Sequence, residues 1–174
     1  KNPEGRVIKV LGKKGDNNVV MESIVLEKGF QITFPQNVEK EAHAIGKKSK
    51  SISQKDIAGR RDFRGVTTFT IDPADAKDFD DAISFQKKSD KVFEIGVHIA
   101  DASYYVREGS ALDREAKHRG VSIYLVDRTI PMLPEVLSND ICSLNPQEDK
   151  LTFSAVFTIE TDGTVHDVWF GRTI

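Results

Sequence analysis

An acidic segment between two strand-like segments constrains the fold of this chain more than any other feature of its sequence. Five aspartates lie within ten residues: Asp72, Asp75, Asp78, Asp80 and Asp81. Residues 66–71 before them are β-branched and aromatic, as in a strand, and Pro73 cannot donate a ladder hydrogen bond. We therefore expect the first strand to end near Asp72 and the chain to re-enter the sheet near Asp81. This turn would bring the aspartates close together.

Clustered aspartates need a physical explanation. Unit charges 4 Å apart repel by about 4 kcal/mol at an effective dielectric constant of 20, so the side chains must splay into solvent, take up protons or neutralise a cation. Ligands that offer only oxygen favour Mg²⁺ or Mn²⁺ over Zn²⁺, and such cations typically serve phosphoryl chemistry. The spacing does not match an EF-hand loop. The pattern alone leaves two interpretations open, a metal site and a solvated turn.

Strand patterns continue through the rest of the chain. Alternating or β-branched residues occur at 82–85, 92–100, 121–126, 152–159 and 164–170, and also at 6–11. The last two of the later segments flank Asp162-Gly163, which is the strongest short signal for a hairpin. Together these patterns predict an α+β fold, mainly an antiparallel sheet with a few short helices.

Three capped segments predict the helices. The first lies between Asp16, Asn17 or Asn18 and Gly29, the second between Asn37 and Gly46, and the third between Ser110 and Gly120. The second follows Pro35, and Asp113 of the third is placed to act as in a capping box.

Residues 47–65 are strongly basic and lack periodicity. Seven lysines and arginines stand against two aspartates, so the local charge is +5. The segment predicts a linker, and two roles stay open for it: a solvated connection or a track that contacts phosphates.

Composition excludes several classes of protein. The 174 residues carry a net charge of −2, with 30% charged and 39% hydrophobic residues, so the chain is globular and is not a uniformly basic nucleic-acid binder. No apolar stretch approaches the roughly 20 residues of a membrane span, so we expect no membrane association. The single cysteine, Cys142, excludes an intrachain disulfide, and we expect it to be a packed thiol in a reducing compartment. His98, in a strand, is expected to be structural.

The two ends of the sequence bear on whether this chain is a whole protein or a piece of one. Residue 1 is a lysine, and residues 168–174 have the pattern of a strand interrupted in its course. The first residues lack a signal-peptide pattern. We expect this chain to be a piece of a longer protein.

Several motifs resemble those of the ribonuclease II superfamily, whose catalytic domain is the RNB domain. They are Arg60-Arg61-Asp62-Phe63-Arg64, residues 70–82 with the aspartates, Val97-His98-Ile99-Ala100-Asp101, residues 130–134, residues 137–139 and Cys142-Ser143-Leu144. The resemblance implies three parts. Residues 1–46 would be the tail of a cold-shock or OB-like barrel with a small helical connector, 47–65 a basic linker, and 66–174 the N-terminal part of an incomplete RNB domain.

The resemblance also implies the site residues. The family's catalytic aspartates match Asp72, Asp78, Asp80 and Asp81, which would hold Mg²⁺, or Mn²⁺ in its place. Asp72 and Asp81 match magnesium ligands, Asp80 matches the position on which the chemistry depends most, and Asp75 matches none of the four. Tyr124 matches an aromatic residue that stacks on a nucleotide, although it could equally pack under the loop.

The implied activity is that of a processive, metal-dependent 3′→5′ exoribonuclease in the cytoplasm. It would act on single-stranded RNA and release nucleoside 5′-monophosphates, with Arg60, Arg61 and Arg64 contacting the RNA. Because the family's domain is longer than this chain, we expect the 174 residues alone to be inactive. The alternative is a non-catalytic RNA-binding or regulatory relative of the same fold.

Overall fold

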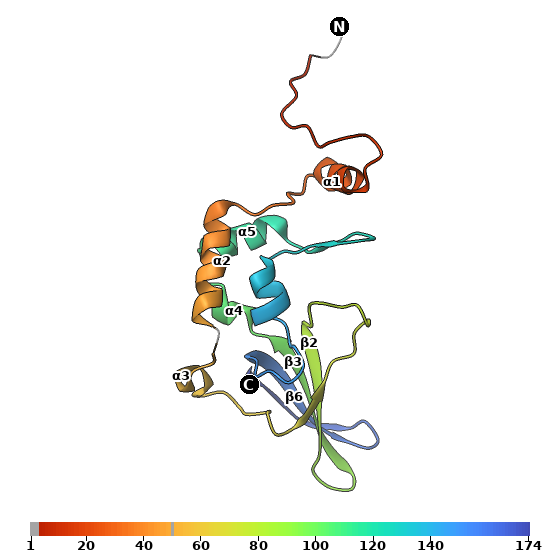
Figure 1. Ribbon diagram of the computed structural model, residues 1–174. Coiled ribbons are helices and arrows are strands. Elements are labelled where there is room, and N and C mark those ends of the chain that lie inside the picture. The colour runs from red at the N-terminus through yellow and green to blue at the C-terminus, as the bar shows by residue number, and fades with distance from the viewer. Residues whose placement is uncertain (1–3, 50) are drawn as a thin grey trace.

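The computed structural model describes residues 4–49 and 51–174, and Figure 1 shows a sheet with a group of helices at one end. The strands within these ranges are β1 (Thr67–Phe69), β2 (Asp81–Lys87), β3 (Val92–Ala100), β4 (Ile123–Tyr124), β5 (Thr129–Ile130), β6 (Thr152–Glu160) and β7 (Val165–Thr173). The helices are α1 (Asn17–Glu27), α2 (Gln36–Lys48), α3 (Gln54–Ile57), α4 (Ala102–Tyr105), α5 (Ala111–Arg119) and the π-helix η1 (Val136–Ile141). The predicted α+β class is confirmed.

The main sheet has five antiparallel strands in the order β1-β2-β3-β6-β7. The predicted hairpin is present, since β6 pairs with β7, and β2 pairs with β3 in the same antiparallel manner. The turn between β6 and β7 uses the predicted Asp-Gly pair: Gly163 has a φ of +89°, and the Asp162 carboxylate accepts the Thr164 N–H at 2.9 Å. A separate hairpin, β4–β5, projects from the helical end (Figure 1).

The two faces of the main sheet differ in how far other parts of the chain pack against them. On one face, the ring of Phe63 packs edge-on against His98, with ring centroids 4.7 Å apart. The other face carries apolar side chains that stay largely accessible, among them Phe85, Phe153 and Phe170. This difference follows from the alternation of side chains along each strand, which the pairing register preserves.

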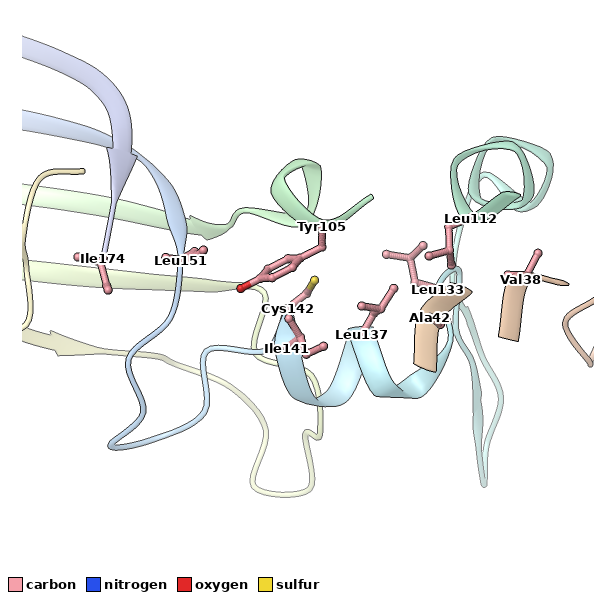
Figure 2. Close-up of a cluster of buried hydrophobic side chains, with 10 residues drawn as sticks. All are labelled: Val38, Ala42, Tyr105, Leu112, Leu133, Leu137, Ile141, Cys142, Leu151 and Ile174. Carbon is pink, nitrogen blue, oxygen red and sulfur yellow. The ribbon is translucent and has the colours of Figure 1, made fainter. Parts of the chain in front are cut away.

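The core joins the helices to one end of the sheet. Figure 2 shows buried side chains running from Val38 and Ala42 of α2, past Leu112 and Leu137, to Leu151 and Ile174 beside the sheet. Cys142 lies in this cluster, and burial raises the pKa of its thiol to about 12. The prediction of a packed thiol is confirmed.

The second predicted helix is longer than expected. Gly46 was predicted to stop it, but α2 runs through Gly46 to Lys48. A Cβ at Gly46 would lie 2.7 Å from Cγ2 of Val136 in η1. The glycine is therefore explained by the close approach of two helices, which local sequence does not reveal. Asn37 is also not the cap, because α2 begins at Gln36, directly after Pro35.

The other helix ends match the prediction. Asp16 caps α1, and its carboxylate accepts the Asn18 N–H at 2.8 Å. Ser110 caps α5, which ends at Gly120 with a φ of +74°. The capping box predicted with Asp113 is only half formed: the Asp113 N–H donates to Ser110 Oγ at 3.1 Å, but the Asp113 carboxylate accepts the N–H of Gly109, at 2.8 Å, instead of that of Ser110.

Two predicted strands differ in the structure. Residues 6–11 form no strand, and Val7 and Ile8 are exposed, because no segment within the described ranges pairs with them. Of residues 121–126, only Ile123 and Tyr124 are paired, opposite Thr129 and Ile130. Alternation along a sequence predicts a strand only where a partner is available.

The predicted linker at 47–65 contains structure. Ser53 and Asp56 form a capping box that starts α3. Further along, the Arg61 N–H donates to the Arg172 carbonyl at 3.0 Å, and the Ile174 N–H donates to the Arg61 carbonyl at 3.1 Å. Residues 61–63 thus lie along the end of β7; Lys50 lies outside the described residues. No helix within the described ranges is long and apolar enough to cross a membrane.

Candidate active site

The acidic residues lie on the loop between β1 and β2. The strand β1 ends at Phe69, slightly before the predicted position, and β2 begins at Asp81 as expected. A turn within the loop is closed by the Ala76 N–H, which donates to the Pro73 carbonyl at 3.0 Å. The chain therefore leaves the sheet before Pro73 and re-enters it at Asp81, as the sequence predicted.

Backbone hydrogen bonds anchor the second half of this loop from two sides. The Ala100 N–H, at the end of β3, donates to the Asp80 carbonyl at 3.0 Å. From the other side, the Leu144 N–H donates to the Phe79 carbonyl at 2.8 Å, and the Phe79 N–H donates to Ser143 Oγ at 2.9 Å. Residues 79 and 80 are consequently held in place, whereas the bonds of the first half are local.

Three of the four matched aspartates act electrostatically on the fourth, Asp80. Asp72, Asp80 and Asp81 are exposed as residues, and Asp78 is half-buried. Partial burial of the Asp80 carboxyl group raises its pKa, and the negative charges of Asp78, Asp81 and Asp72 raise it further. The loop thus creates a local excess of negative charge with Asp80 at its centre.

The donor set fits a hard divalent cation by its chemistry, because it offers carboxylate oxygens without nitrogen or sulfur. The geometry is less complete. Among residues 4–49 and 51–174, no three His, Cys, Asp or Glu side chains are grouped closely enough to hold a metal ion. The negative charges of the loop therefore act on Asp80, but the carboxylates of the described residues are not gathered into a complete metal-binding cluster.

Tyr124 extends from the β4–β5 hairpin toward the acidic loop. Its hydroxyl donates to Asp78 Oδ2 at 3.2 Å, and the residue is 65% exposed. Burial of the hydroxyl, followed by the charge of Asp78, raises the tyrosine pKa. The structure thus places the predicted aromatic residue beside the acidic loop with an accessible ring.

A cleft of about 630 Å³ borders the same loop. Its lining includes Thr70 and Ala82 at the two ends of the loop, the rings of Phe63 and Phe69, and residues 144–150. We assigned no role to residues 144–150 from the sequence, except that Leu144 belongs to a motif that resembles one of the family's. The long-range contacts of this segment include the Leu144 N–H, which donates to the Phe79 carbonyl, and the ion pair of Asp149 with Arg64, and a sequence carries no direct signal for either.

The three arginines predicted to contact RNA have different surroundings. The side chain of Arg61 pairs with Glu94 at 2.7 Å and lies over the rings of Phe63 and Trp169. Arg64 pairs with Asp62 at 2.6 Å and with Asp149 at 3.3 Å. Both keep a partly exposed side chain, at 37% and 40%.

Arg60 does not fit the predicted contact with RNA. Its side chain is 3% exposed and pairs with Asp101, which is 1% exposed, at 2.8 Å. A guanidinium buried in this way has no surface to offer a phosphate, because its donors are used inside the protein. The basic run in the sequence gave no indication of this burial.

His98 has the structural role predicted for it. Its Nδ1 lies 2.7 Å from Ser154 Oγ and its Nε2 lies 2.8 Å from Ser84 Oγ, so the neighbouring strands satisfy both ring nitrogens. Burial, and then the charge of Arg61, lowers the histidine pKa.

The fold and the loop together define a class of protein, an α+β domain that presents four aspartates at one end of an antiparallel sheet. Residues 60–174 match the RNB domain family, and residues 1–35 match the cold shock domain family. The chain belongs to the RNB domain family. This confirms the family resemblance that the motifs indicated.

The relatives include bacterial ribonuclease R. The ribonuclease R of Thermotoga maritima is 48% identical over 173 residues, which cover 97% of this chain and 24% of that protein. A structure of Mycoplasma genitalium RNase R in complex with ribose methylated single-stranded RNA is 32% identical with a TM-score of 0.85, and the match covers 95% of this chain and 25% of that one. The chain therefore spans about a quarter of these relatives.

A third relative has the same fold. The structure of yeast Ssd1, described as a pseudonuclease, has a TM-score of 0.75 and 19% identity, and the match covers 94% of this chain and 20% of that one. At this identity the likeness concerns the fold alone.

Proposed function

We propose that this chain is the aspartate-bearing segment of a metal-dependent 3′→5′ exoribonuclease. The whole protein would act processively on single-stranded RNA in the cytoplasm and release nucleoside 5′-monophosphates. The observation that carries the proposal is that Asp72, Asp78, Asp80 and Asp81 share one loop, held at residues 79 and 80, where partial burial and then the charges of the other three raise the pKa of Asp80. Membership of the RNB family and the likeness to ribonuclease R support it.

The carboxylates have a definite role in such a reaction. The scissile phosphate and the attacking hydroxide are both anionic, so carboxylates cannot stabilise their encounter directly. Asp72 and Asp81 would hold Mg²⁺ or Mn²⁺, with Asp78 and Asp80 completing the ligand set. The cation, when bound, lowers the pKa of a water and neutralises charge on the phosphate.

Other residues would position the RNA. The exposed ring of Tyr124 lies beside the acidic loop and offers a stacking surface for a base. Arg61 and Arg64, with partly exposed side chains, are the arginines of the basic segment that remain able to contact phosphates. The RNA in the Mycoplasma genitalium complex makes such a ligand reasonable for this chain.

One observation favours a second candidate, a non-catalytic RNA-binding relative. Within the described ranges, no three potential ligands are gathered as a metal site would require. A protein that binds RNA without turnover would keep the fold and the stacking aromatic residue without needing the cation. It would respond to RNA but not to Mg²⁺.

The activity test uses the full-length protein that contains this chain. We expect Mg²⁺-dependent release of nucleoside monophosphates from a single-stranded oligoribonucleotide, and a loss of at least about 100-fold in Asp80→Asn. Asp75→Asn is the matched control, because Asp75 is an exposed aspartate of the same loop that matches no catalytic position. The 174-residue chain, assayed in parallel, is expected to release none.

Two outcomes would count against the proposal. Equal activity of Asp80→Asn and the wild type would refute the assigned role of the loop. RNA binding without any release of nucleotides by the full-length wild type would favour the second candidate.

A further inference from the structure

A buried ion pair joins Arg60 to Asp101, the residue that directly follows β3. Arg60 Nη2 donates to Asp101 Oδ2 at 2.8 Å, and both side chains are almost fully buried. Ser103 Oγ donates to the other carboxylate oxygen of Asp101 at 2.9 Å. Burying two charges is costly, so such a pair is poorly explained by stability alone and better explained by the geometry that it imposes.

The remaining donors of Arg60 bind backbone carbonyls from separate elements. Nε donates to the Asp56 carbonyl of α3 at 3.0 Å, while Nη1 donates to the carbonyls of Thr152 at 3.1 Å and Thr173 at 3.2 Å. One guanidinium therefore links α3, the start of β6 and the end of β7. The planar fork of arginine suits this arrangement, and a lysine ammonium cannot reproduce it.

Asp101 connects this junction to the acidic loop. It follows Ala100, whose N–H donates to the Asp80 carbonyl at 3.0 Å. Its own N–H donates to the Leu151 carbonyl at 2.9 Å, next to Thr152. Asp101, which pairs with Arg60, therefore directly follows Ala100, whose amide forms the hydrogen bond to the Asp80 backbone.

We propose that Arg60 is a positioning residue for Asp80. The guanidinium fixes Asp101 and the adjoining strand ends, and this fixes the Ala100 amide on which the Asp80 backbone rests. The consequence for catalysis rests on the proposed function, but the positioning itself is a property of this chain. Arg60 therefore acts from inside the protein and not at the RNA.

Hydrogen exchange of backbone amides tests the positioning in the 174-residue chain without metal or RNA. We expect Arg60→Met to accelerate exchange of the Ala100 amide at least tenfold relative to amides in the middle of β3 and β6. A residue that only adds global stability would accelerate all slowly exchanging amides alike. Arg64→Met is the control, because Arg64 belongs to the same segment but forms exposed ion pairs.

Two further variants keep the test decisive if Arg60→Met does not fold. Arg60→Lys retains the charge beside Asp101 but cannot reach all the carbonyls, and we expect it to fold with a fast Ala100 amide. The double variant Arg60→Met, Asp101→Leu removes both buried charges, so its melting temperature should recover while Ala100 still exchanges fast. Restored protection of Ala100 in either variant would overturn the proposal.

Mn²⁺ binding separates this inference from the proposed function. If the aspartates bind the cation, Arg60→Lys should weaken the affinity about tenfold, as the loss of outer supporting groups does at other metal sites. If the wild-type chain binds no Mn²⁺, the metal role assigned to the loop fails. The positioning of Asp80 by Arg60 is then decided by the exchange of Ala100 alone.

Discussion

His98 is an example of a residue whose role follows from its immediate neighbours. Both ring nitrogens face serine hydroxyls on adjacent strands, and the ring is buried under Phe63. Burial disfavours the imidazolium, so the pKa of His98 is lowered relative to the unfolded chain. The sequence predicted a structural strand histidine, but it could not identify the two serines, which lie 14 and 56 residues away.

This lowered pKa predicts how stability depends on pH. The unfolded chain takes up a proton near pH 6.5 and the folded chain only at a lower pH, so stability is lost as the pH falls below about 6.5. We expect His98→Gln to flatten the dependence of the unfolding free energy between about pH 5 and pH 7. Urea titrations at several pH values measure it, and His118→Gln, at an exposed position, serves as control. An unchanged slope in His98→Gln would contradict the account.

Arginines illustrate the opposite case at the residue scale. Sequence reasoning treated Arg60, Arg61 and Arg64 alike, as parts of one basic run. The structure buries the first against Asp101 and leaves the other two partly exposed. The carboxylates that pair with Arg60 and Arg61 lie more than 30 residues away in the sequence. The local density of charge therefore does not indicate which arginine is buried.

Among the elements, those governed by local signals were predicted well. The hairpin around Asp162-Gly163 and the helix capped by Ser110 are set by turn and cap chemistry within a few residues. The strand expected at 6–11 failed because a strand also needs a partner. The acidic loop lies between these cases: Pro73 predicted the turn, whereas its anchoring by Ser143 and Ala100 is long-range.

The contact between α2 and η1 gives a prediction at the element scale. In an isolated helix, Gly46→Ala should stabilise by about 1 kcal/mol. Here the new methyl group would meet Val136 Cγ2 at 2.7 Å, and overpacking costs about 1–3 kcal/mol, so we expect a net loss. Chemical denaturation measures it. Val136→Ala removes the obstructing atom, so the double variant should lose less than the sum of the single variants, and strict additivity would count against this packing.

At the scale of the whole molecule, nucleic-acid binding cannot come from net charge. The chain is slightly acidic overall, and the three arginines of its basic segment each pair with a carboxylate within the fold. We therefore expect affinity for RNA to depend on local groups of exposed cations and on stacking rather than on net charge.

This distribution predicts a shallow dependence of RNA binding on salt. If Arg64 exchanges its carboxylate partners for a phosphate, Arg64→Gln should reduce the slope of log K against log salt concentration by about 0.7. Fluorescence anisotropy of a labelled single-stranded oligoribonucleotide, titrated at several KCl concentrations, gives the slope. Lys117→Gln, which removes an exposed cation of α5, should leave it unchanged. The same slope in wild type and Arg64→Gln would exclude Arg64 from the interface.

The most direct test of the account is a calorimetric titration of the 174-residue chain with Mn²⁺. The account predicts that the wild type and Asp75→Asn bind the ion, and that Asp80→Asn binds it at least about tenfold more weakly. Equal affinities of all three proteins, or no binding heat in the wild type, would contradict the claim that the acidic loop gathers its charges around a cation.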